Sequence, residues 1–178
     1  MKYSRSSPSP RYRELLAQYR QMHREGAPEI GLPPGSTFPG TSLLPHLRDI
    51  KKLIGETGAR TLLDYGCGKA LQYRPQRLAL PGVDGEWDSV AEYWDVDAVS
   101  YYDPGYPPHD QLPDKRSDGV ICTDVLEHCP EPDITWIVDE IFSFADKFVF
   151  ATIASTPARK RLPNGENAHC TIRPIEYW

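Results

Sequence analysis

Apolar residues recur at two different spacings along the chain, and these spacings predict an alternation of helices and strands. The spacing of an amphipathic helix, with an apolar side chain at roughly every third or fourth position, begins at Tyr12, near Ser42 and after Pro132. Short runs that are mainly apolar or β-branched predict strands at residues 61–65, 98–102, 119–123 and 148–153. The run at 119–123 is continuously apolar, which is typical of a buried parallel strand. Strand and helix therefore alternate broadly over residues 42–154, which predicts a doubly wound, mostly parallel α/β sheet.

Proline and glycine mark off a leading segment from the rest of the chain. Residues 1–41 contain the first expected helix and then a stretch, residues 26–40, in which both residue types are frequent. That composition predicts an ordered lid segment rather than a flexible linker. Residues 42–178 carry the alternating pattern and are expected to form the main domain, for which the chain of 178 residues is long enough.

Charge and cysteine content narrow the class of protein. With 20 Lys and Arg against 25 Asp and Glu, the net charge of -5 argues against a nucleic-acid binder, whose surface is usually basic. The chain has no apolar run of about 18 residues that would span a bilayer, and its N-terminus lacks the apolar core of a signal peptide. The four cysteines lack a disulfide-framework spacing. We therefore expect a cytoplasmic protein with reduced thiols.

Polar residues follow three of the expected strands, at the ends where ligands bind in open α/β sheets. The first strand runs into Asp64-Tyr65-Gly66-Cys67-Gly68, whose glycines let a ligand approach the backbone closely. The second is followed by Asp103, a carboxylate that can accept two hydrogen bonds from a ribose, or else a simple turn residue. The third runs into Thr123-Asp124-Val125-Leu126-Glu127-His128. Because neighbouring parallel strands end side by side, these three places can converge on one crevice.

This order of motifs resembles that of the class I S-adenosylmethionine-dependent methyltransferases. The family places Asp-x-Gly-x-Gly after one strand and an acid after the next, and residues 118–128 are similar to its later strand and Leu-Glu-His loop. The resemblance covers about residues 42–154. It implies a Rossmann-like methyltransferase fold, S-adenosylmethionine as cofactor, and methyl transfer to oxygen or nitrogen of a small-molecule or glycan-like acceptor.

The resemblance also implies a role for each matching residue. Asp64, with the backbone of Gly66 and Gly68, would face the methionine part and the ribose of the cofactor. Asp103 would hold the ribose hydroxyls, and Asp124 would border the methyl sulfonium. The residues expected at the cofactor are Asp64, Tyr65, Gly66, Cys67, Gly68, Asp103, Pro104, Asp110, Thr123 and Asp124.

Methyl transfer from a sulfonium needs mainly in-line positioning, with a general base only for a hydroxyl or a protonated amine. His128 is the first candidate base, because an imidazole titrates near neutrality. Its alternative role is a structural histidine that caps the loop. His169 is the second candidate, and Asp124 completes the expected catalytic set.

A metal site is not predicted, although soft and imidazole ligands cluster after the third strand. The residues concerned are Cys122, Asp124, His128 and Cys129. The cysteines lack zinc-site spacing, and Cys122 is expected inside a buried strand.

Two spacings depart from the family pattern. Asp64 and Asp103 are further apart than the roughly 20 residues expected between the glycine loop and the ribose acid, which predicts an insertion at about residues 71–95. Asp84 and Asp88 are the alternative ribose acids.

A short proline-rich loop then replaces the helix and strand that the family has between Asp103 and Asp118. Asp110 is therefore the expected remnant of the adenine pocket. The chain also ends at Trp178 without the family's final hairpin, which predicts a reduced or truncated sheet. Its uncovered edge would be open to a second copy in a homodimer.

Two other functions fit parts of the same pattern. A NAD-dependent oxidoreductase shares the sheet and the ribose acid, but its Gly-x-Gly-x-x-Gly motif needs glycine where this chain has Leu71. A non-catalytic module in a complex would retain the S-adenosylmethionine pocket as a scaffold.

Overall fold

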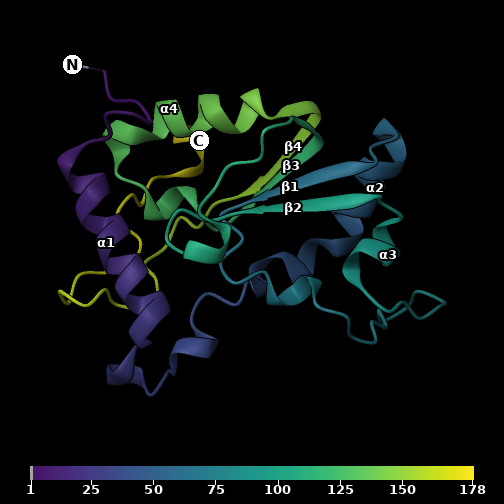
Figure 1. Cartoon of the computed structure of the whole chain (residues 1–178), viewed down its shortest axis with the longest axis horizontal. Helices are drawn as coiled ribbons and strands as arrows, with labels where there is room; N and C mark the ends of the chain where they lie inside the picture. The colour runs from purple at the N-terminus through teal and green to yellow at the C-terminus, as the bar shows by residue number, and fades with distance from the viewer. Residues whose placement is uncertain (1) are drawn as a thin grey trace.

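Four parallel strands form one sheet at the centre of the molecule, in a computed structural model that describes residues 2–178. The strands are β1 (Thr61–Tyr65), β2 (Ala98–Tyr102), β3 (Ser117–Thr123) and β4 (Ala145–Thr152). They are ordered β2-β1-β3-β4 across the sheet, and each neighbouring pair is parallel (Figure 1). The predicted doubly wound α/β fold is therefore confirmed.

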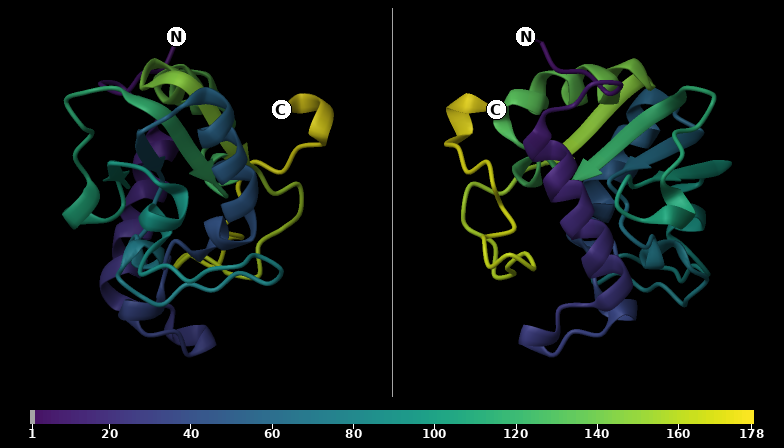
Figure 2. Two further views of the ribbon diagram at one scale, coloured as in Figure 1. Left: turned by 90° about the vertical axis from the view of Figure 1, so that its right-hand side faces the viewer. Right: turned by 60° about the vertical axis from the view of Figure 1, so that its left-hand side comes forward.

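Helices cover both faces of the sheet and the carboxyl ends of its strands. α2 (Leu47–Thr57) and α3 (Val90–Trp94) lie on one face, and α4 (Glu131–Ser143) lies on the other (Figure 1). α1 (Pro10–Glu25) stands beyond the carboxyl ends of the strands, as the right-hand view of Figure 2 shows. No helix within residues 2–178 is long and apolar enough to cross a membrane.

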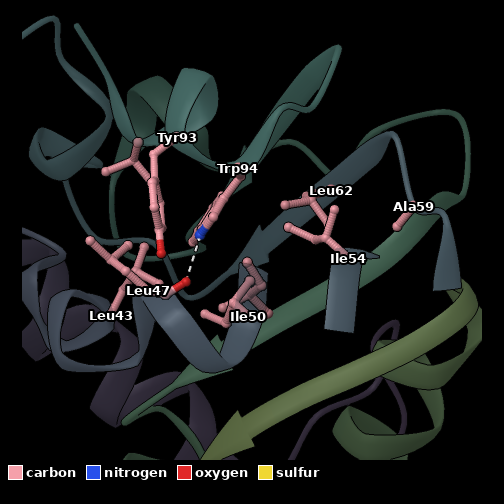
Figure 3. Close-up of a cluster of buried hydrophobic side chains, with 10 residues drawn as sticks. Leu43, Leu47, Ile50, Ile54, Ala59, Leu62, Tyr93 and Trp94 are labelled. Atoms are coloured by element: carbon pink, nitrogen blue, oxygen red, sulfur yellow. Dashed lines mark hydrogen bonds between the residues drawn. The ribbon is translucent and has the colours of Figure 1, made fainter. Parts of the chain in front are cut away.

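Successive side chains of β1 pack against opposite helical layers. Leu62 belongs to the apolar cluster with α2 and α3, where Trp94 donates its indole N–H to a carbonyl of α2 at 3.0 Å (Figure 3). Leu63 packs in the cluster on the α4 side. Because side chains alternate along a strand, Asp64 shares the face of Leu62 and Tyr65 shares that of Leu63. This alternation decides which residues at the end of β1 can face a ligand.

Several elements begin at residues other than those predicted. The helix expected near residue 42 is a 3₁₀ segment (Thr41–His46) followed by α2, because Pro45 has no N–H to donate within an α-helix. β3 and β4 begin at Ser117 and Ala145, before the predicted residues 119 and 148. The weakly periodic residues 71–95 hold a 3₁₀ turn (Leu71–Tyr73) and the short α3.

Ser9 caps α1, and its removal should weaken the helix. Its hydroxyl oxygen accepts the N–H of Tyr12 at 3.0 Å. Loss of such a cap costs about 1 kcal/mol, so Ser9→Ala is expected to lower the free energy of unfolding by about that amount in urea denaturation. Ser143→Ala, at the exposed end of α4, is the control and should change stability by less than about 0.5 kcal/mol. Equal stability of the Ser9→Ala variant and the wild type would contradict the capping role.

Candidate functional site

A cavity of about 590 Å³ lies at the carboxyl ends of the strands. Its walls come from the loops after β1, β2 and β3, from α1, from the lid segment, and from residues 157–169. In the right-hand view of Figure 2, α1 and this C-terminal part of the chain both lie on the side of the sheet where the strands end. The hydroxyl of Tyr19 on α1 donates to the carbonyl of Ala168 at 2.8 Å and joins the two walls. The volume is typical of pockets that bind small molecules.

Most of the residues predicted for the site line this cavity. They are Asp64, Gly66, Cys67, Gly68, Asp103, Pro104, Thr123, Asp124, His128 and His169. Tyr65 lies on the α4 face of the sheet instead, where its hydroxyl donates to Glu140 at 2.6 Å. Asp110 follows a 3₁₀ turn outside the cavity, and Asp84 and Asp88 also lie outside it.

The glycine loop after β1 uses its backbone donors within the chain. The N–H groups of residues 66 and 67 both donate to the carbonyl of Tyr102, and that of residue 68 donates to Asp103 Oδ2. Those of residues 69, 70 and 71 donate to the carbonyls of Phe38, Cys67 and Pro39, respectively. All six distances are 2.7 to 3.1 Å. Phosphate groups are commonly bound by free N–H groups of such loops. In residues 66–71 no N–H group remains for that purpose.

Both glycines of this loop are required by their own neighbours. Gly66 has φ +84°, and a Cβ there would lie 2.3 Å from the side chain of Val125. Gly68 has φ +58°, and a Cβ there would lie 2.3 Å from the carbonyl oxygen of Phe38. Glycine adopts such angles without a steric cost and needs no room for a side chain. The two residues therefore let the lid segment pack directly on the loop.

Asp64 is a buried carboxyl group in the wall of the cavity. Its Oδ2 accepts the hydroxyl of Tyr73 at 2.9 Å and the amide of Gln72 at 3.1 Å. Burial raises the pKa of Asp64 to about 7, although the hydrogen bond from Tyr73 opposes this, and the nearby charge of Asp103 adds to it. Asp64 therefore ionises close to neutral pH.

Asp103 joins the loop after β2 to the glycine loop. Oδ2 accepts the N–H of Gly68 at 2.9 Å, and Oδ1 accepts the N–H of Gly105 at 2.8 Å. Burial raises the pKa of this carboxyl group, and the two backbone hydrogen bonds counteract the rise. Each carboxylate oxygen has further lone pairs, which leaves Asp103 able to accept hydrogen bonds from a ribose in the cavity as well.

Asp124 adopts a left-handed backbone conformation at the end of β3, with φ +55°. Its Oδ1 accepts the hydroxyl of Thr152 at 3.0 Å, which fixes the side chain against β4. Aspartate tolerates this conformation better than most residues, and unusual backbone angles tend to cluster at functional sites. The turn brings Asp124 to the cavity wall beside the glycine loop.

His128 is held in one tautomer by its neighbours. Its Nδ1 lies 2.9 Å from the carbonyl oxygen of Ala168 and 2.8 Å from the hydroxyl of Tyr19. Because the carbonyl only accepts, Nδ1 carries the proton and Nε2 keeps a free lone pair. Burial, with a smaller effect from His169, lowers the pKa of His128 to about 4, so the ring is neutral at pH 7.

His169 lies against His128, with the ring centroids 4.7 Å apart. Its Nδ1 lies 2.6 Å from the carbonyl oxygen of Thr156 and donates to it by the same reasoning. The two imidazoles therefore both direct their protonated nitrogens to backbone carbonyls.

Three residues of the cavity region carry contacts that no sequence motif indicated. Lys69 donates to Nδ1 of His23 at 2.9 Å and to the carbonyl of Thr37 at 2.8 Å. Burial lowers the pKa of Lys69 to about 8 and that of His23 to about 3. Tyr19, read from the sequence only as part of an apolar stripe, bonds to His128. The available clue was that Tyr19 and His23 are four residues apart and share one face of α1.

Comparison of the chain with protein-family models, curated proteins and solved structures finds no match.

Proposed function

We propose that the protein transfers a methyl group from S-adenosylmethionine to oxygen or nitrogen of a small-molecule or saccharide acceptor. The observation that carries the proposal is the chemical character of the glycine loop. Its six N–H groups are engaged within the chain, and Asp64, Asp103 and Asp124 stand around it in the cavity wall. A cavity that carries three carboxylates and offers no free N–H group in this loop suits a cationic ligand. S-adenosylmethionine carries both a sulfonium and an ammonium group.

The same feature argues against a dinucleotide cofactor. A pyrophosphate is bound by free loop N–H groups at the start of a helix. After this loop the chain forms only the 3₁₀ turn Leu71–Tyr73, and the N–H groups of residues 66–71 already have partners. We therefore rank NAD-dependent oxidation below methyl transfer.

Each carboxylate of the cavity has a part in the proposed binding mode. Asp64, which is buried and ionises near neutral pH, would pair with the ammonium of the methionine part. Asp103 would accept from the ribose hydroxyls through lone pairs that its loop contacts leave free. Asp124 would border the sulfonium, where a nearby negative charge offsets the positive charge of the methyl donor.

The acceptor would enter from the side of α1 and residues 157–169. This side of the cavity carries His128, His169, Arg159 and Lys160. The ring nitrogens of His128 and His169 that do not donate to backbone carbonyls can accept a proton from a hydroxyl or an amine. Arg159 and Lys160 favour a polar or anionic acceptor.

Titration calorimetry tests the proposal directly. The purified protein is titrated with S-adenosylmethionine, S-adenosylhomocysteine and NAD, and we expect both sulfur compounds to bind and NAD not to bind. Turnover is then sought on a panel of small-molecule and saccharide acceptors by following S-adenosylhomocysteine release. Failure of both sulfur compounds to bind would refute the proposal. Tight binding without turnover would favour the alternative of a non-catalytic module, for which the short connection from β2 to β3 already gives some support.

A further inference from the structure

We infer that Glu127, His128 and His169 bind a divalent transition-metal ion in the wall of the cavity. One ligand atom from each of the three residues can be chosen so that the atoms lie within 4.8 Å of one another. The metal site depends only on these three side chains, whereas the role of the bound ion in catalysis rests on the proposed methyl transfer.

Glu127 provides the first argument, because half of its carboxylate has no partner. Its side chain is 0% exposed, and Oε1 accepts the N–H of Ala154 at 2.9 Å. Oε2 is buried without a hydrogen bond among the described residues. A buried carboxylate oxygen left unpaired is costly to stability, so its retention in this position calls for a ligand. A cation would satisfy it.

The two imidazoles provide the second argument. Nδ1 of His128 donates to the carbonyl of Ala168 at 2.9 Å, and Nδ1 of His169 donates to that of Thr156 at 2.6 Å. Metal-binding histidines usually donate one ring N–H to a carbonyl or carboxylate, which orients the other nitrogen toward the metal. Both Nε2 lone pairs are thus available.

The three ligand atoms must move somewhat closer together to bind one ion. Ligands at about 2.1 Å from a tetrahedral metal stand roughly 3.4 Å apart, so a separation of up to 4.8 Å must shrink by up to about 1.4 Å on binding. His169 is only partly buried, and its ring can make most of that movement by turning about its hydrogen bond to the carbonyl of Thr156. Glu127 and His128 are held by the contacts described above.

The donor set indicates the class of metal. Two imidazoles and one carboxylate suit Zn²⁺, Co²⁺, Mn²⁺ or Fe²⁺ better than Mg²⁺ or Ca²⁺, which prefer oxygen ligands. The set differs from the cysteine-containing one considered from the sequence, with which it shares only His128. Cys129 does not belong to the cluster, and its thiol donates to the carbonyl of Val125 at 3.5 Å.

The ion would assist the acceptor in the proposed reaction. Three protein ligands leave a coordination position open, and His128 and His169 line the cavity. An acceptor hydroxyl bound there would have a lowered pKa and would release its proton to water. The oxygen then forms a bond to the methyl carbon, while the carbon–sulfur bond breaks and its electron pair remains on the sulfur of S-adenosylhomocysteine. With the metal bound, the two imidazoles act as ligands rather than as bases.

Cobalt binding tests the site without reference to activity. The full chain is treated with a chelator, dialysed, and titrated with Co²⁺ while its visible absorption and the heat of binding are recorded. We expect one equivalent to bind. His169→Ala and Glu127→Gln each change a direct ligand, so each should weaken binding by more than the roughly 10- to 100-fold that loss of an outer partner costs. The glutamine can still accept the N–H of Ala154, which protects the fold.

His46→Ala is the matched control, because His46 lies outside both the cluster and the cavity. It should bind Co²⁺ as the wild type does, and it should also bind S-adenosylhomocysteine as the wild type does. Absence of Co²⁺ binding by the wild type, or wild-type binding by both cluster variants, would overturn the inference. Co²⁺ binding in a protein that binds no S-adenosyl compound would instead leave the metal site standing and refute the proposed function.

Discussion

Replacement of Gly68 by alanine is expected to destabilise the protein by about 2–3 kcal/mol. The left-handed conformation at this residue costs a non-glycine residue about 1–2 kcal/mol. The new Cβ would lie 2.3 Å from the carbonyl oxygen of Phe38, so the lid segment must move away. That movement breaks the hydrogen bond from the N–H of Lys69 to the same carbonyl at 2.8 Å, worth about 1 kcal/mol. Urea denaturation measures the total, and weaker ligand binding should accompany it.

Gly55→Ala is a control with the opposite expected sign. Gly55 is exposed within α2, and nothing lies within 4 Å of a Cβ placed on it. Alanine is the better helix former by about 0.8–1 kcal/mol, so this variant should be more stable than the wild type. A Gly68→Ala variant that matched the wild type in stability would show that the lid does not pack on the glycine loop.

The affinity for S-adenosylmethionine is expected to increase as the pH rises through about 7. Below this pH Asp64 is protonated in the free protein, because burial raises its pKa to about 7. Only the ionised form pairs with a cationic ligand, so binding weakens by up to about tenfold for each pH unit below 7. Calorimetry from pH 5.5 to about 8.5 follows the change. Removing the charge with Asp64→Asn should lower the affinity by about 30-fold or more at pH 8 and flatten the profile.

The stability of the ligand-free protein should change with pH in the opposite direction. A carboxyl group whose pKa is raised in the folded state stabilises the protein fully below its unfolded value of 3.8. This contribution is lost as the pH rises toward about 7. Asp64→Asn should remove this decrease of the free energy of unfolding with rising pH. Asp49→Asn, on the exposed surface of α2, should retain the decrease. Identical pH profiles for all three proteins would contradict the assignment of Asp64.

The strands were predictable because each contains a short, mainly apolar run, and the two central strands, β1 and β3, are buried in the middle of the sheet. β1 and β2 have the predicted bounds, and the doubly wound arrangement followed from the alternation with helices. Strand ends also predicted where the cavity lies, since side chains after parallel strands meet at one edge. Tyr65 could have been placed as well, because strand alternation turns it away from the face of Asp64.

Contacts between distant segments could not be read from the sequence. The pairing of Lys69 with His23 joins residues from different elements, and so does the contact of Tyr19 with His128. Neither pair forms a recognisable sequence motif, because both contacts depend on how α1 lies across the ends of the strands. Glu127 belonged to a recognised motif, but only the structure revealed that one of its oxygens is buried without a partner.

The lid contacts also determine how a ligand would meet the glycine loop. Since the chain itself satisfies the amides of residues 66–71, the loop already has its final shape before any ligand arrives. Ligand binding then costs little conformational entropy in the backbone of the loop, so more of the interaction free energy contributes to affinity. Phe38 and Pro39 of the lid, together with Tyr102 and Asp103 at the end of β2, thereby act as an internal template for the loop.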